Sequence, residues 1–89
     1  HIAWLGWKTL PHAFEMAGQP YERPVRVEVI GPAYAKYVFG PPDTDQVIKG
    51  STGEWCRVVA RRLAVDDANS LSAQGSVAEM ALKVARVYP

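Results

Sequence analysis

The chain has 89 residues, a net charge of +1 and a hydrophobic content of 48%. This length is typical of one small globular domain. The near-neutral charge provides no electrostatic basis for binding nucleic acid or an anionic membrane. No apolar run approaches the ~20 residues of a membrane-spanning helix, and the single cysteine, Cys56, excludes an internal disulfide. A chain with one cysteine fits a reducing compartment, so we expect a cytoplasmic protein.

The first segment, residues 2–17, predicts a helix that is kinked or split at Pro11 and ends at Gly18. Three large aromatic side chains belong to this helix: Trp4, Trp7 and Phe14. They are more than a core of this size easily accommodates. We therefore expect the helix to contact a missing N-terminal helical domain or a partner subunit, including a second copy in a homodimer. The alternative is that it packs on the chain's own sheet.

A linker is predicted next, because residues 19–24 contain two prolines that favour extended backbone. Residues 25–30 then alternate apolar and polar side chains, which predicts a strand with the valines on its buried face. Three further strands are predicted at residues 34–39, 46–49 and 70–74, the first of which forms a hairpin with strand 25–30.

The central helix is predicted at residues 51–63. Ser51 and Glu54 have the spacing of a capping box at its start. Its apolar stripe consists of Trp55, Cys56, Val59, Ala60 and Leu63. This pattern places Cys56 in the core. Cations near the last turns suit the helix dipole, and they are Arg57, Arg61 and Arg62.

A final helix begins at Ser76, where Ser76 and Glu79 repeat the capping-box spacing. Its apolar stripe is Val77, Met80, Ala81, Val84 and Val87. The whole pattern predicts an α+β fold. An N-terminal helix precedes a small β-β-β-α-β-α domain with a mainly antiparallel sheet and two helices on one face.

The sequence shows no self-evident active site. His1 and His12 do not have the spacing of zinc ligands with each other or with Cys56. Two pairs of carboxylates lie in predicted loops: Asp43 with Asp45, and Asp66 with Asp67. Neither pair matches a calcium loop or a catalytic dyad. We therefore assign no catalytic residue and no metal ligand.

Arg61 and Arg62 are the remaining candidates. The planar fork of an arginine is suited to a two-pronged contact with a carboxylate. At the end of a packed helix, one of the two can point across the sheet edge and the other into solvent. On the residues alone, the alternative is that both only complement the helix dipole at the surface.

A family resemblance adds to this interpretation. It rests on these residues: His1-Ile2-Ala3, Leu5-Gly6, Thr9, Pro24-Val25-Arg26-Val27-Glu28, Gly31-Pro32, Phe39-Gly40, Gly50-Ser51, Trp55-Cys56-Arg57-Val58-Val59, Arg61-Arg62, Asp66-Asp67 and Gly75. The chain resembles the C-terminal part of actinobacterial proteins related to the mycothiol-dependent maleylpyruvate isomerases. This group includes DinB-like metal-binding and wyosine-base-formation-like proteins. The family often has proline where this chain has Ser51.

The resemblance implies two domains: a DinB-like helical bundle that binds a divalent metal such as zinc, and a domain similar to sterol carrier protein 2. Residues 1–18 would then be the end of the bundle, residues 19–24 a linker and residues 25–89 the second domain. The chain lacks the glutamate-x-x-x-histidine stretch that supplies family metal ligands, so no metal site is expected here. Arg61, with Arg62 beside it, matches an arginine that helps form the thiol-cofactor site between the domains.

The leading hypothesis is therefore an accessory domain of a metal- and thiol-dependent isomerase or transferase. Such a domain would help form a site for mycothiol or an acidic substrate, and would not be catalytic alone. Two alternatives remain open, a small hydrophobic-ligand-binding module and a non-catalytic interaction or dimerisation domain.

Overall fold

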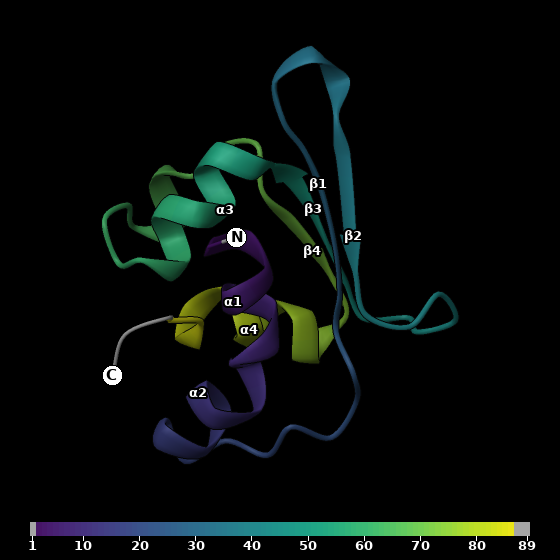
Figure 1. The fold of residues 1–89 in the computed structure, drawn as a ribbon. Coiled ribbons are helices and arrows are strands. Elements are labelled where there is room, and N and C mark those ends of the chain that lie inside the picture. The colour runs from purple at the N-terminus through teal and green to yellow at the C-terminus, as the bar shows by residue number, and fades with distance from the viewer. Residues whose placement is uncertain (1, 87–89) are drawn as a thin grey trace.

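The computed structural model describes residues 2–86, which form an α+β fold as predicted. Its helices are α1 (Ile2–Lys8), α2 (Leu10–Met16), α3 (Thr52–Val59) and α4 (Ser76–Val84). Its strands are β1 (Arg26–Ile30), β2 (Lys36–Phe39), β3 (Val47–Ser51) and β4 (Ser72–Gln74). Figure 1 shows α1, α3 and α4 on the same side of the sheet. Among these residues, no helix has the length and apolar character that crossing a membrane requires.

The four strands form one mixed sheet in the order β2-β1-β3-β4. The predicted hairpin is confirmed, because β1 pairs antiparallel with β2. β1 is parallel to β3, and β3 is antiparallel to β4, so two of the three pairings are antiparallel. The alternating pattern of β1 is confirmed as well: Val25, Val27 and Val29 are fully buried.

The predicted N-terminal helix is two helices separated at Thr9. The hydroxyl of Thr9 donates a hydrogen bond to the carbonyl of Leu5 at 2.7 Å. Pro11 lies in the first turn of α2, where its missing N–H removes no helical hydrogen bond. The break therefore falls two residues before the proline that causes it.

The three N-terminal aromatic side chains have different environments. Phe14 is buried in the core shared with the sheet and α4, and Trp4 is exposed. Trp7 is half-buried, stacks on Phe39 and donates from Nε1 to the carbonyl of Val25 at 2.8 Å. Trp55 of α3 donates in turn to the carbonyl of Ala3 at 2.9 Å. Of the three, Trp4 is thus the side chain with substantial surface for a partner.

The capping box of α3 is confirmed in one direction, because the amide of Glu54 donates to Ser51 Oγ at 3.1 Å. A capping box also requires the Glu54 carboxylate to accept a hydrogen bond from the Ser51 amide, and this second hydrogen bond is not formed. The carboxylate accepts instead from the amide and hydroxyl of Ser70, at 2.8 and 2.5 Å, and Ser70 Oγ accepts from the Ser51 amide. The start of α3 is therefore tied to the segment that precedes β4.

The capping box predicted for α4 is wrong. Gly75 is the N-cap residue, and Gln46 Oε1 accepts from the amides of Val77 and Ala78 at 2.9 and 3.2 Å. Gln46 is buried, and a Cβ atom on Gly75 would lie 2.2 Å from Gln46 Oε1. The glutamine thus occupies the space where a side-chain cap would be. Val87 of the predicted stripe lies outside the described residues.

Candidate anion-binding site

The C-terminus of α3 differs from the prediction, because the helix ends at Val59 rather than at residue 63. Arg61 has a φ of +62°, in the left-handed region. The Arg61 amide donates to the carbonyl of Val58 at 3.0 Å, and the Arg62 amide donates to the carbonyl of Arg57 at 2.8 Å. These two hydrogen bonds define a Schellman motif in which Arg61 is the C′ residue.

The same motif ends α2, where the sequence predicted it. Gly18 has a φ of +69°, and its amide donates to the carbonyl of Glu15 at 3.1 Å. Glycine is the usual C′ residue because it has no Cβ atom to crowd the following carbonyl. Arg61 therefore occupies a position that glycine fills more favourably, at a cost of about 1 kcal/mol. Strain of this kind persists where the surroundings hold it, often at functional sites.

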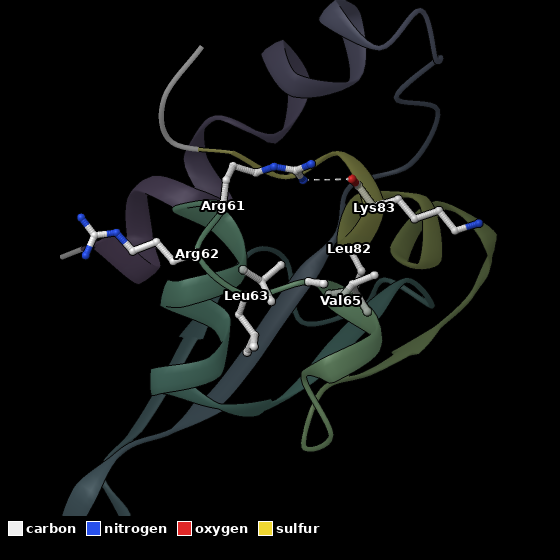
Figure 2. A pocket seen from close by; sticks show the side chains of 8 residues that line it. Arg61, Arg62, Leu63, Val65, Leu82 and Lys83 are labelled. Atoms are coloured by element: carbon white, nitrogen blue, oxygen red, sulfur yellow. Dashed lines mark hydrogen bonds between the residues drawn. The ribbon is translucent and has the colours of Figure 1, made fainter.

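The side chain of Arg61 extends from α3 to α4. Its Nη1 donates to the carbonyl of Lys83, in the last turn of α4, at 3.3 Å (Figure 2). Figure 2 also shows the Arg62 side chain directed away from Arg61 and from α4. The fold therefore separates the two guanidinium groups that the sequence presented as neighbours, and one crosses to α4 while the other points outward.

Two adjoining grooves meet at Arg61. The first has a volume of about 560 Å³ and is lined by Val58, Arg61, Arg62, Leu63, Ala64, Val65, Leu82 and Lys83. The second has a volume of about 220 Å³ and is lined by Ala13, Met16, Ala17, Arg61, Lys83, Val84 and Arg86. Arg61 and Lys83 line both grooves, so a ligand in either one would contact the same pair of cations.

The lining of the two grooves is cationic and otherwise mainly apolar. Arg61, Arg62, Lys83 and Arg86 contribute positive charge, and none of the lining residues is acidic. The C-terminal dipoles of α3 and α4 offset part of this charge. Nε of Arg86 is buried and has no hydrogen-bond partner within residues 2–86. An unpaired buried donor is costly, and an anion that accepted a hydrogen bond from it would remove that cost.

Sequence reasoning identified Arg61 but missed Lys83 and Arg86. Lys83 lies in the last turn of α4 and Arg86 two residues beyond its end. Positive charge is favoured there by the helix dipole, and this was the only indication of either residue in the sequence. Nothing in the sequence indicates that the ends of α3 and α4 lie together.

The other residues considered from the sequence do not form a site. Cys56 is half-buried and packs against the core, and this burial raises the pKa of its thiol, which opposes a nucleophilic role. His12 is exposed, and His1 lies outside the described residues. Between residues 2 and 86, no three histidine, cysteine or carboxylate side chains are close enough together to hold a metal ion.

Comparison with known proteins gives two distant relatives. They are uncharacterized proteins of Mycobacterium tuberculosis, from strains CDC 1551 and H37Rv, and each is 32% identical to this chain over 88 residues. The alignment covers 98% of this chain and 34% of each relative, so the chain spans about a third of the length of the curated relatives it matches. No family model matches the chain, and no solved structure matches it significantly.

Proposed function

We propose that this chain is an anion-binding accessory domain. In this proposal the end of α3 holds the carboxylate of an acidic substrate for a metal- and thiol-dependent isomerase or transferase. The observation that carries it is the position of Arg61, which has left-handed backbone and lines both cationic grooves. A guanidinium has five N–H donors, and one of them reaches the carbonyl of Lys83. The remaining donors can bind a carboxylate in two-pronged fashion.

The composition of the grooves supports a ligand that is part anionic and part apolar. Arg61, which follows α3, and Lys83 and Arg86, at and just beyond the end of α4, line the second groove and can supply donors. Leu63, Val65 and Leu82 supply an apolar wall beside them. Because charge-assisted hydrogen bonds are stronger beside apolar surface that excludes water, this combination favours a small organic acid over a free inorganic ion.

Metal and thiol chemistry would come from elsewhere in the full-length protein. The described residues contain no cluster that fits a divalent metal such as zinc, so no step on a metal is assigned to this chain. The negative charge of a thiolate cofactor such as that of mycothiol would be favoured by the same cations. A cytoplasmic location, in keeping with the single cysteine, belongs to this proposal.

The proposal is tested by following backbone amide NMR signals while maleate is added, with its neutral diamide as the control ligand. We expect maleate to shift the signals at the ends of α3 and α4, and the diamide to leave them in place. Arg61→Ala should weaken maleate binding about tenfold, the effect of losing one charge-assisted contact. Arg57→Ala is the matched control and should change binding less than about twofold, because Arg57 is exposed on α3 and lines neither groove. Equal responses to maleate and the diamide would reject the proposal.

A further inference from the structure

The hairpin formed by β1 and β2 carries an unusual amount of exposed hydrophobic surface. Six large hydrophobic side chains are exposed among the described residues, and four belong to this hairpin: Ile30 (49% exposed), Tyr34 (91%), Tyr37 (48%) and Val38 (40%). Figure 1 shows the hairpin projecting beyond the helices. The register places Ile30 and Val38 on one face of the hairpin and Tyr37 on the other. Exposed hydrophobic side chains therefore lie on both faces of the projecting hairpin, and such exposure is typical of an interaction surface.

The turn of the hairpin keeps Tyr34 in solvent at an energetic cost. Ala33 and Tyr34 have φ values of +59° and +60°, and the Ala35 amide donates to the carbonyl of Pro32 at 3.3 Å. This is the pattern of a type I′ turn, which Asn and Gly normally occupy. Two left-handed residues other than glycine therefore hold a tyrosine at the tip, where it contributes nothing to the core.

Within residues 2–86, one edge of β2 has no neighbouring strand. β2 is the first strand in the order β2-β1-β3-β4, and the Gly31 amide donates to the carbonyl of Ala35 at 2.7 Å. In an antiparallel pair, hydrogen-bonded positions alternate with non-hydrogen-bonded positions. Tyr37 therefore bonds inward to β1, whereas the N–H and C=O groups of Lys36 and Val38 point outward. Such groups are a template for another strand.

We propose that a second copy of this chain pairs with that edge, β2 against β2, in a twofold antiparallel dimer centred on Tyr37. Charge argues against one alternative that uses the same outward groups. A pairing centred on Lys36 would place two lysines opposite each other, which is destabilising. The pairing centred on Tyr37 places Lys36 opposite Val38 of the partner subunit instead.

The same pairing places side chains of opposite charge in one row that runs across the strands of both copies. Glu28 is the cross-strand neighbour of Val38 within the chain, and Lys36 Nζ is already 3.5 Å from Glu28 Oε1. Across the interface, Lys36 would point over Val38 of the partner subunit toward Glu28 of the partner subunit. A lysine on an edge strand often prevents pairing, but here an acceptor for its charge lies two strands away. The two Tyr37 rings would meet at the axis, in the closely spaced non-hydrogen-bonded position.

The available area fits a weak dimer. With about 200 Å² for a tyrosine side chain, the exposed parts of the four hydrophobic side chains amount to roughly 400 Å² for each copy. Two copies could bury at most roughly 800 Å² in this way, in addition to the strand edges themselves, which is below the range of stable specific interfaces and within that of weak, transient ones. The dimer should therefore dissociate on dilution. This surface is separate from the groove at Arg61, and the inference does not depend on the proposed function.

Sedimentation equilibrium of the 89-residue chain, from about 10 µM to about 1 mM, tests the proposal. We expect a monomer–dimer equilibrium that Val38→Lys weakens at least tenfold, because each new lysine faces Lys36 of the partner subunit. That variant should still fold, since Glu28 lies beside the new charge. The double variant Lys36→Glu/Val38→Lys should restore association, because each lysine then faces a glutamate. Gln74→Lys, on the opposite edge strand β4, is the matched control and should have no effect.

Hydrogen exchange gives a second measurement at the same positions. The amides of Lys36 and Val38 should become protected as concentration rises, and Val38→Lys should abolish that protection. A chain that stays monomeric to about 1 mM would overturn the proposal. So would a dimer that Val38→Lys leaves intact, or one that the double variant fails to restore.

Discussion

Replacing Arg61 by glycine should make the protein more stable while it removes the group we assign to anion binding. Arg61 is a left-handed C′ residue with a φ of +62°. Relief of the Cβ crowding is worth about 1 kcal/mol. The substitution also removes the hydrogen bond to the Lys83 carbonyl, which is exposed and 3.3 Å long and therefore contributes at most about 0.5 kcal/mol. The free energy of unfolding should rise by about 0.5 kcal/mol or more.

Two control variants separate the backbone effect from the side-chain effect. Arg61→Ala keeps the left-handed strain and loses the hydrogen bond, so it should be about 1 kcal/mol less stable than Arg61→Gly. Gly18→Ala makes the reverse change at the same position of α2. A Cβ atom there would have no neighbour within 4 Å, so its cost of about 1 kcal/mol would come from the backbone alone.

Urea and thermal denaturation followed by circular dichroism measure these differences. For a domain of this size, 1 kcal/mol corresponds to a change in Tm of about 4–8 °C. If Arg61→Gly proves less stable than Arg61→Ala, the argument from backbone strain is wrong. Unchanged maleate binding by the stabilised glycine variant would refute the assigned role of the side chain.

Three further predictions concern other parts of the fold. Gln46→Ala should lower the free energy of unfolding by about 1–3 kcal/mol, because two buried amides at the start of α4 lose their acceptor; exposed Gln74→Ala is the control in the same denaturation assay. Ala33→Asn with Tyr34→Gly should raise stability by about 1–2 kcal/mol, since these residues suit a type I′ turn, and no gain in urea would contradict the assigned turn. The hydrogen bond from Arg26 lowers the pKa of Glu28 below its ordinary value of 4.5. The ionised Glu28 carboxylate therefore stabilises the fold fully above pH 4.5, and this stabilisation is lost as the pH falls through the lowered pKa. Arg26→Gln should raise that pKa in a carboxyl NMR titration and weaken the dependence of stability on pH.

Local patterns predicted most of the elements because each depends on neighbouring residues. The alternation of apolar and polar residues predicted β1 and its buried valines, and Gly18 predicted the end of α2. The spacing of Ser51 and Glu54 located the start of α3 to within one residue. These features follow from backbone sterics and from amphipathic periods of two or 3.6 residues. The same reasoning extended α3 to residue 63, because no sequence rule places an arginine at a left-handed C′ position.

The remaining features required the tertiary structure because they join residues far apart in the chain. Gln46 displaces the capping box of α4 from 31 residues away, and Ser70 takes the second half of the capping box of α3 from 16 residues away. The candidate site is of the same kind. The sequence determined that a cation would end the central helix, but Arg61 reaches Lys83 only because α3 and α4 end side by side. Packing against a common sheet brings those two ends together, and a pattern within a single helix cannot specify which distant residue its end will meet.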